Sequence, residues 1–303
     1  MPNRLAGAIC AAILILITPA DAIGAIPRPG AMTFPGPGPT PSPPGSATPS
    51  GPSSSGSPTP GPSTSGSTLG SRHRLFFANA QRESLTGTAS ARRRMRLMVK
   101  ALHRSRADVG VLVELDGSQP RFFRNRTRGS WELISAGHGV RNAVIYDSSV
   151  WTLVSRKTIP TYWKGGRRTR TPVVILRTES GEQVGVIGVH NPRDDSRLRR
   201  VNNRRILAAV RRLQRDGIGV LTAGDFNTGR AALCLYTGRR HQMASAGHRR
   251  RHACRDHRSA RIDQAFATPD VQLRGYRRSA SRATDHGAVY SIGFRLRHRR
   301  TSA

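Results

Sequence analysis

From residue 71 onward the sequence contains a series of short apolar runs rich in β-branched residues, and each run ends in a polar residue. Such runs predict buried strands. Strand ends hold side chains more firmly than free loops do, so several polar strand ends in one chain indicate a site built on a rigid sheet. The runs and their ends are 75–78 with Asn79, 109–113 with Glu114, 184–189 with His190, and 218–223, which leads through Gly224 to Asp225.

Two segments between these runs have helical periodicity. Residues 91–106 place Met95, Met98, Val99 and Leu102 on one face, at the spacing of an amphipathic helix. A second helix is predicted over 198–213, with arginines on its outer face. Further strands are predicted at 143–146, 151–155, 172–177, 261–267 and 289–294. Because strands outnumber helices, we expect an α/β fold made of two packed sheets with helices outside, rather than a doubly wound parallel sheet.

The first 22 residues are typical of a secretory signal peptide, with Arg4, an apolar run over 5–17, and small residues at Ala20 and Ala22. The run is shorter than the roughly 20 residues that cross a bilayer. We therefore expect a secreted or cell-surface protein with a cleaved signal, and an uncleaved N-terminal anchor is the alternative. Residues 23–72 are rich in Pro, Ser, Gly and Thr and predict a disordered linker. One domain over 73–298 and a short tail, 299–303, complete the predicted organisation.

The net charge is +33, and only Arg4, Arg28 and Asp21 of the charged residues precede residue 71. A strongly positive domain attracts polyanions in a salt-dependent way. The expected partner is nucleic acid, bound through its backbone, and the protein is expected to be a monomer. Binding to an anionic membrane or wall polymer, or a genomic bias toward arginine, could also explain the charge. Aromatic residues are only 5% of the chain, which argues against a stacking platform for single strands. The arginine clusters are 92–94, 167–170, 199–205, 239–240 and 249–251.

Three cysteines are present, and Cys10 lies within the predicted signal. In an exported protein, the remaining pair Cys234 and Cys254 predicts a disulfide, which would contribute about 3 kcal/mol by closing its loop. A metal-binding pair is the alternative, but the CxxC spacing is absent.

The carboxylates suggest a metal site. Glu114 follows a run that reads as a buried strand, where a carboxylate is costly unless it is paired or bound to a cation. The available ligands are the oxygens of Asn79, Glu114 and Asp285, and no Cys or His cluster has zinc spacing. The expected ion is therefore Mg²⁺, with Mn²⁺ or Ca²⁺ as alternatives.

Two further motifs suggest proton transfer and phosphate binding. In the run Gly224 to Asn227, glycine would permit a sharp turn, and the spacing of Asp225 and Asn227 points both to one side, where they could orient a water and hold a phosphoryl oxygen. The adjacent Asp285 and His286, with Asp263 on an earlier strand, suggest an imidazole oriented by a carboxylate for acid/base work. His190 is suited to contact negative charge developing on phosphorus.

In their order and rough spacing, these motifs resemble the endonuclease/exonuclease/phosphatase superfamily over residues 74–296. The resemblance implies a four-layer α/β sandwich that hydrolyses a phosphate ester by metal-assisted, in-line attack of water. It implies that Asn79, Glu114 and Asp285 bind the metal. It also implies that Asp225 or the Asp263–His286 pair activates the water, and that Asn227 and His190 bind the scissile phosphate.

The sequence departs from the family pattern at two positions. Relatives usually have glutamine where this chain has Val113, and often asparagine where it has Gly188. The stretch that begins at Arg141 resembles the strand entering the substrate face, so Arg141 is a candidate phosphate contact. The leading hypothesis is an exported endonuclease or exonuclease. The alternatives are a sphingomyelinase-like phospholipid hydrolase, with Tyr162 and Trp163 as its membrane contact, a phosphomonoesterase, and a non-catalytic cationic surface protein.

Overall fold

A computed structural model describes residues 70–137, 142–246, 254, 261–284 and 287–297. All of these residues belong to one compact unit, 62–303. The predicted signal peptide and nearly all of the predicted linker lie outside the described residues. Arg141, Asp285 and His286 also lie outside them, so the predictions for these three residues remain predictions.

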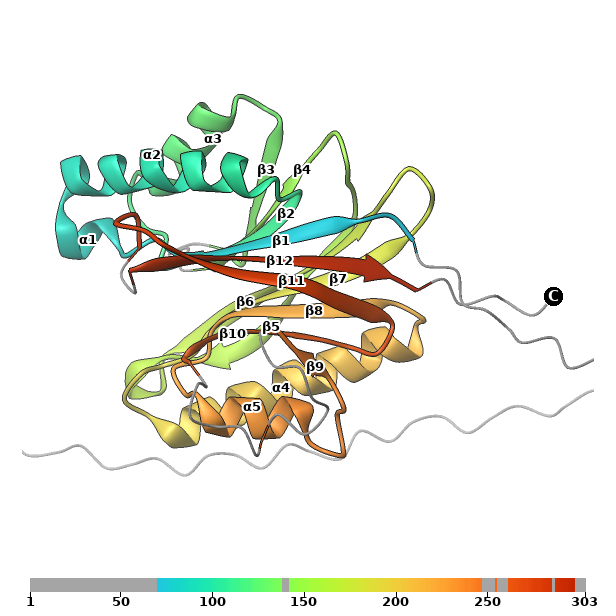
Figure 1. The fold of residues 1–303 in the computed structure, drawn as a ribbon. Coiled ribbons are helices and arrows are strands. Elements are labelled where there is room, and N and C mark those ends of the chain that lie inside the picture. The colour runs from blue at the N-terminus through green and yellow to red at the C-terminus, as the bar shows by residue number, and fades with distance from the viewer. Residues whose placement is uncertain (1–69, 138–141, 247–253, 255–260, 285–286, 298–303) are drawn as a thin grey trace, which may run out of the picture. The chain divides into compact units, whose positions relative to one another are not determined.

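The described chain forms two mixed β-sheets, each with six strands (Figure 1). In both sheets two central strands run parallel, β1 with β2 and β7 with β8, and the other pairings are antiparallel. The first sheet has the order β11 (Val271–Ala280), β12 (Ala288–Leu296), β1 (His73–Asn79), β2 (Val109–Val113), β4 (Asn142–Asp147) and β3 (Trp131–Ser135). The second has the order β5 (Thr152–Tyr162), β6 (Arg168–Arg177), β7 (Gln183–His190), β8 (Gly219–Asp225), β10 (Asp263–Ala267) and β9 (Ala244–Ser245).

Helices cover the outer face of each sheet, which gives four layers (Figure 1). On the first sheet lie α1 (Glu83–Thr86), α2 (Thr88–Ser105) and α3 (Gln119–Thr127), and on the second lie α4 (Ser196–Arg215) and α5 (Arg230–Thr237). A single 3-10 turn, η1 (Lys164–Gly166), joins β5 to β6. The predicted four-layer α/β sandwich is confirmed.

Three apolar clusters hold the layers together. The largest joins the inner faces of the two sheets and includes Leu75, Val111 and Leu221. A second packs α2 and α3 against the first sheet, and a third packs α4 and α5 against the second. Side chains alternate between the two faces of a strand, and the central strands are buried on both faces. Apolar residues are therefore needed at every position, and this explains the continuous apolar runs.

Strand lengths differ from the prediction on the edge of the second sheet. Strand β5 continues to Tyr162, and strand β6 begins at Arg168. Both therefore reach well beyond the predicted apolar runs, because the two strands pair with each other as a hairpin. Gly165 and Gly166 allow the tight connection, since both have positive φ angles, 68° and 72°. The residues of β5 and β6 next to the turn are largely polar, so no apolar run in the sequence predicted that the strands continue there.

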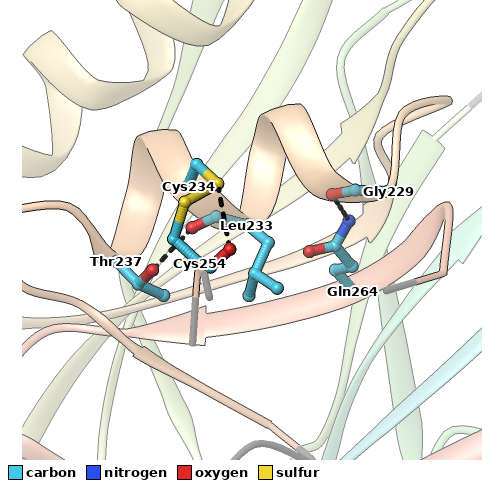
Figure 2. The surroundings of a disulfide bond; sticks show 6 residues. All are labelled: Gly229, Leu233, Cys234, Thr237, Cys254 and Gln264. Atoms are coloured by element: carbon cyan, nitrogen blue, oxygen red, sulfur yellow. Dashed lines mark hydrogen bonds between the residues drawn. A yellow bond between two sulfur atoms is a disulfide. The ribbon is translucent and has the colours of Figure 1, made fainter. Parts of the chain in front are cut away.

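The predicted disulfide between Cys234 and Cys254 is present (Figure 2). Cys234 lies on α5, whose first turn is fixed to the second sheet because the Nε2 atom of Gln264 donates to the carbonyl of Gly229 at 2.9 Å. The sequence separation of the two cysteines is 20. Closing a loop of this size stabilises the fold by about 3 kcal/mol.

Candidate active site

Inward-facing positions change from apolar to polar at one end of the sandwich. On β7 the alternation that buries Val184 and Val186 in the central core continues to His190, and on β8 it continues from Ala223 to Asp225. The strand register brings these ends together: His190 pairs with Asp225, Asp225 with Asp263, Asn79 with Val113, and Val113 with Asn142. The candidate site therefore lies where the central apolar core ends.

His190 connects the two sheets at this end. Its Nε2 atom lies 3.5 Å from Oε1 of Glu114, which follows β2 in the first sheet, and 3.9 Å from Oδ2 of Asp225 in the second sheet. His190 and Asp225 are both buried. The structure thus brings together three residues that the sequence predicted for one site.

Glu114 is held in a strained backbone conformation. Its φ angle is 59°, in the left-handed region that residues other than glycine rarely adopt. Its side chain is only 12% exposed, and Oε2 lies 3.8 Å from Nε of Arg82. Within the described part of the chain, no hydrogen bond reaches either carboxylate oxygen. A nearly buried carboxylate in this state has free lone pairs that a cation can use.

Asn79, at the end of β1, lies on the strand next to the one that leads into Glu114. Its Oδ1 accepts a hydrogen bond from the main-chain N–H of Gln81 at 3.0 Å. Its buried Nδ2 has no hydrogen-bond partner among the described residues. Because an amide oxygen has two lone pairs and Oδ1 accepts this one hydrogen bond among the described residues, its second lone pair remains available to a ligand.

Buried Gln119, which the sequence analysis did not single out, joins the loops that follow β1 and β2. Its Nε2 donates to the carbonyls of Ala80 at 3.3 Å and Gln81 at 3.1 Å, and its Oε1 accepts from the main-chain N–H of Asp116 at 3.0 Å. These bonds fix the chain next to both Asn79 and Glu114. No pattern in the sequence marks this role, because the contact depends on how the two loops meet.

The donor set fits a hard divalent cation. Among the described residues, no group of three or more His, Cys, Asp or Glu side chains could hold a metal ion. Asn79, at the end of β1, and Glu114, directly after the neighbouring strand β2, nevertheless supply oxygen donors. No hydrogen bond among the described residues uses the Glu114 carboxylate oxygens, so they suit a cation such as Mg²⁺. The third predicted ligand, Asp285, lies outside the described residues.

The Asp225 to Asn227 segment is arranged by its own hydrogen bonds. The main-chain N–H of Asn227 donates to Oδ1 of Asp225 at 2.7 Å, which holds both side chains at the same end of the sheet. Asn227 has a φ angle of 48°, a left-handed conformation that asparagine tolerates better than most residues. This geometry agrees with the prediction that the side chains of Asp225 and Asn227 point to the same side.

The predicted role of Gly224 is wrong. Gly224 does not form a turn but lies within β8, paired with Val189 of β7. Its φ angle is 147°, and an added Cβ would lie 1.9 Å from the carbonyl oxygen of Val189. Glycine is therefore required by the close approach of the neighbouring main chain.

Asp263 faces the opposite sheet across the end of the core. Burial raises the pKa of the Tyr290 hydroxyl on β12, and the negative charge of Asp263 raises it further. The same two causes contribute to the pKa of Tyr276, which is raised to about 12, with burial again the largest. The charge of Asp263 therefore acts on Tyr290 of β12 in the first sheet. In the second sheet, Asp263 lies opposite Asp225 in the strand register.

The turn that joins β5 to β6 closes the other side of His190. The ring of Trp163 packs edge-on against the imidazole, with ring centroids 4.6 Å apart. Tyr162 is turned toward α4, where the Arg205 guanidinium stacks 4.7 Å from its ring centroid. Lys164, Arg167 and Arg168 are exposed on the same turn.

A buried set of amide side chains next to Asn227 was also missed by the sequence analysis. Its members are Asn191, Asn202 and Asn203. A signal did exist: Asn202 and Asn203 occupy positions on the face of the second predicted helix that also carries Ile206 and Val210. Polar residues on a buried helix face need hydrogen-bond partners inside the protein.

Comparison with solved structures shows the same fold in several proteins. An endonuclease/exonuclease/phosphatase family protein from Bacteroides thetaiotaomicron is 11% identical with a TM-score of 0.61, over 75% of this chain and 98% of that chain. D. rerio TDP2 in complex with a single-strand DNA product is 16% identical with a TM-score of 0.58, over 74% and 99%. A mannosyl-6-phosphatase from Bacteroides thetaiotaomicron is 10% identical with a TM-score of 0.56, over 73% and 98%.

No curated protein matches the sequence. The model of the Endonuclease/Exonuclease/phosphatase family matches residues 76–286, a range that includes Asn79, Glu114, His190, Asp225, Asn227 and Asp263. This range covers well over half of the chain and agrees with the four-layer fold. The chain therefore belongs to the endonuclease/exonuclease/phosphatase family, whose members are phosphoric-ester hydrolases.

Proposed function

We propose that this protein is an exported, Mg²⁺-dependent nuclease that hydrolyses phosphodiester bonds of DNA or RNA. The observation that carries the proposal is the position of His190 between Glu114 and Asp225, at the end of the core of a phosphoric-ester hydrolase fold. A buried imidazole beside two carboxylates provides both a hydrogen-bond donor and proton acceptors within one small site.

The side chains divide the work of hydrolysis. The N–H at Nε2 of His190 can donate to a non-bridging phosphate oxygen, and Asn227 can donate to another through its amide. Asp225, which lies opposite Asp263 in the register of β8 and β10, supplies a carboxylate that can accept a proton from the attacking water. A divalent cation held by Asn79 and Glu114 would supply Lewis-acid stabilisation of charge on the phosphate. The predicted Asp285 and His286 would complete this set.

Positive charge next to the site supports nucleic acid as the substrate. Lys164, Arg167 and Arg168 are exposed on the turn that also carries Trp163, which contacts His190. No ion pair within the described part of the chain involves these three cations. They can therefore contact the phosphates that flank a scissile bond. One structural neighbour, TDP2, was solved with a single-strand DNA product, which supports the same substrate class.

The orientation of two aromatic residues disfavours a phospholipid substrate. A membrane-binding hairpin would expose Tyr162 and Trp163, but Tyr162 stacks with Arg205 and Trp163 packs against His190. The large apolar side chains that are exposed in the described part of the chain come from separate elements: Leu85, Leu97, Val154, Ile262 and Tyr276. Neither the two aromatic residues nor these separate exposed side chains provide an apolar surface of the kind that inserts into lipid.

Among the described residues, no helix is long and apolar enough to cross a membrane.

Export is proposed from the N-terminal sequence, where residues 1–22 have the layout of a signal peptide. The disulfide between Cys234 and Cys254 supports it, because disulfides persist in oxidising compartments. Detection of the protein outside the cytoplasm of its host, with a new N-terminus near residue 22, would test this part of the proposal.

A substrate comparison tests the catalytic part. The full chain with Mg²⁺ is incubated at low salt with closed circular plasmid, linear duplex DNA, RNA, sphingomyelin vesicles and a phosphomonoester. We expect cleavage of nucleic acid that weakens steeply with added salt, since each phosphate contact contributes about −0.9 to the slope of log affinity against log salt for duplex DNA. Nicking of the circular plasmid would identify an endonuclease. Turnover of sphingomyelin or the phosphomonoester without cleavage of any nucleic acid would reject the proposal.

A further inference from the structure

Two consecutive asparagines are buried on the inner face of α4, although neither contacts a residue that was predicted for the site. Asn202 is 0% exposed and Asn203 is 3% exposed. A buried amide destabilises a fold unless its polar atoms are hydrogen-bonded, so two such residues side by side require a specific set of partners.

Asn203 holds the side chain of Asn191, the residue that follows His190. Oδ1 of Asn203 accepts from Nδ2 of Asn191 at 3.0 Å and from the hydroxyl of Tyr236 at 3.3 Å. Asn202 reaches the same residue, because its Nδ2 donates to Oδ1 of Asn191 at 3.2 Å. Both ends of the Asn191 amide are therefore fixed by helix α4.

The main chain of Asn191 in turn contacts the end of β8. Its N–H donates to the carbonyl of Asp225 at 2.9 Å, and its carbonyl accepts from Nδ2 of Asn227 at 2.7 Å. A carbonyl oxygen can only accept, so this bond fixes which end of the Asn227 amide faces Asn191. The second hydrogen on the same Nδ2 atom is left as a donor for a ligand.

The same bond secures the backbone of Asn227. The residue has a left-handed φ angle of 48°, and its own N–H donates to Oδ1 of Asp225 at 2.7 Å. A residue persists in this conformation only when its surroundings hold it there. The tether from α4 through Asn191 provides such a constraint on one side, and Asp225 provides it on the other.

We propose that Asn203 is a positioning residue, which acts through Asn191 to fix the Asn227 amide for contact with the scissile phosphate. The inference rests on the proposed function, because it takes Asn227 as a phosphate contact. Asn203 lies on the outer helical layer and touches neither the substrate nor the reacting atoms. Its effect on the reaction is transmitted by two consecutive hydrogen bonds, from Asn203 to Asn191 and from Asn191 to Asn227.

The first test replaces Asn203 with leucine in the full chain and measures kcat and KM on the nucleic acid cleaved by the wild type. Loss of the acceptor releases the Nδ2 end of the Asn191 amide, while Asn202 still holds its Oδ1. We expect kcat to fall about 10- to 100-fold, as for other residues that orient a residue of the site. Asn203→Asp keeps an oxygen acceptor, and we expect its kcat to stay within about threefold of wild type. Tyr236→Phe is the matched control, because it removes a different bond to Asn203 and leaves the Asn191 bond intact. The Tm of each variant is measured to separate folding from catalysis.

A double-mutant cycle with Asn227→Ala shows whether the effect passes through Asn227. In that background we expect Asn203→Leu to lower kcat by less than about twofold, because the group that it positions has already been removed. An equal loss in both backgrounds would overturn the proposal. So would a leucine variant with wild-type kcat, or an aspartate variant as impaired as the leucine variant.

A readout that needs no substrate separates this inference from the proposed function. The side-chain NH₂ signals of Asn227, identified by their disappearance in Asn227→Asp, are followed by ¹⁵N NMR. We expect both signals to be shifted and to exchange faster with water in Asn203→Leu, and to be unchanged in Tyr236→Phe. If the wild type cleaves no nucleic acid, the proposed substrate is wrong, yet these signals still decide whether Asn203 positions Asn227. Unchanged signals in the leucine variant would overturn the positioning role.

Discussion

The Nε2 atom of His190, which ends β7 of the second sheet, lies 3.5 Å from Oε1 of Glu114, which follows β2 of the first sheet. The contact occurs where the apolar core between the sheets ends and inward-facing positions become polar. Chemistry at this place therefore depends on the packing of the two sheets against each other, as well as on the loops that follow the strands.

Glu114→Gln tests the catalytic role of this carboxylate. The substitution keeps the shape of the side chain but removes its charge, so we expect kcat to fall roughly 10³-fold or more, with little change in Tm. Glu132→Gln is the matched control, because Glu132 is an exposed glutamate on β3 of the same sheet. Steady-state cleavage of DNA measures both variants. Equal activity of the two variants would remove Glu114 from the site.

The backbone strain at Glu114 adds a stability readout at the same position. Because its φ angle is 59°, glycine should fit the backbone better than alanine. We expect Glu114→Gly to be more stable than Glu114→Ala by about 1 kcal/mol, while both lack activity. Chemical denaturation compares the two variants. A glycine variant less stable than the alanine variant would contradict the left-handed conformation.

The sequence was sufficient to predict the fold where strands are buried on both faces. The run 109–113 matches β2, and the predicted helices correspond to α2 and α4. It was insufficient where an element lies at the surface. Strand β11 is an exposed edge with arginines at 274, 277 and 278, and α3 has only Phe122 and Phe123 as large apolar residues. Without a continuous apolar pattern, such elements are determined by their neighbours in space.

The same distinction applies to the site. Asn79, Glu114, His190 and Asp225 follow buried strands, and their positions at strand ends were enough to predict that they lie together. Gln119 and Asn203 act from helices through contacts 38 and 12 residues away in sequence, to Gln81 and Asn191. Pairings of this kind depend on tertiary structure, so local patterns could show only that Asn203 is a polar residue on an apolar face.

Gly188 has little room for a side chain. An added Cβ would lie 3.2 Å from Cγ1 of Val111 and 3.4 Å from Cγ of Pro172, within the packed space between the sheets. We expect Gly188→Ala to lower the free energy of unfolding by about 1–3 kcal/mol. Thermal or denaturant unfolding measures this loss.

Val111→Ala provides the control for this prediction, because it removes the atom that an alanine at 188 would meet. In the Val111→Ala background, we expect Gly188→Ala to cost less than it does in the wild type. The same loss of stability in both backgrounds would show that crowding against Val111 is not the cause.

Asp263→Asn should make two tyrosines easier to ionise. The Asp263 carboxylate raises the pKa of Tyr290 and contributes to the pKa of Tyr276, although burial is the larger cause for both. Removing the negative charge therefore lowers both pKa values, and each hydroxyl ionises at a lower pH than in the wild type. Titration of ¹³C-labelled tyrosine by NMR measures this shift. Asp270→Asn serves as a control carboxylate, and identical titrations of wild type and Asp263→Asn would show that Asp263 does not face β12.

The cationic turn between β5 and β6 should contribute to substrate binding more than to the chemical step. We expect the triple substitution Lys164→Gln, Arg167→Gln and Arg168→Gln to raise KM for duplex DNA with little change in kcat. The salt slope of KM should become shallower by about 2 to 3, if each cation contacts one phosphate. An equivalent triple change on α2, at Arg92, Arg93 and Arg96, controls for the loss of overall charge. An equal effect of the two triple variants would indicate a general field rather than a contact at this turn.

Metal dependence of DNA cleavage by the full chain is the most direct test of the account. The protein is depleted of metal with a chelator, assayed on closed circular and linear duplex DNA, and assayed again after Mg²⁺ is restored. The account predicts no cleavage by the depleted protein, recovery with Mg²⁺, and no recovery for Glu114→Gln. Cleavage that persists in excess chelator, or a restored wild type that leaves DNA and RNA intact, would contradict it.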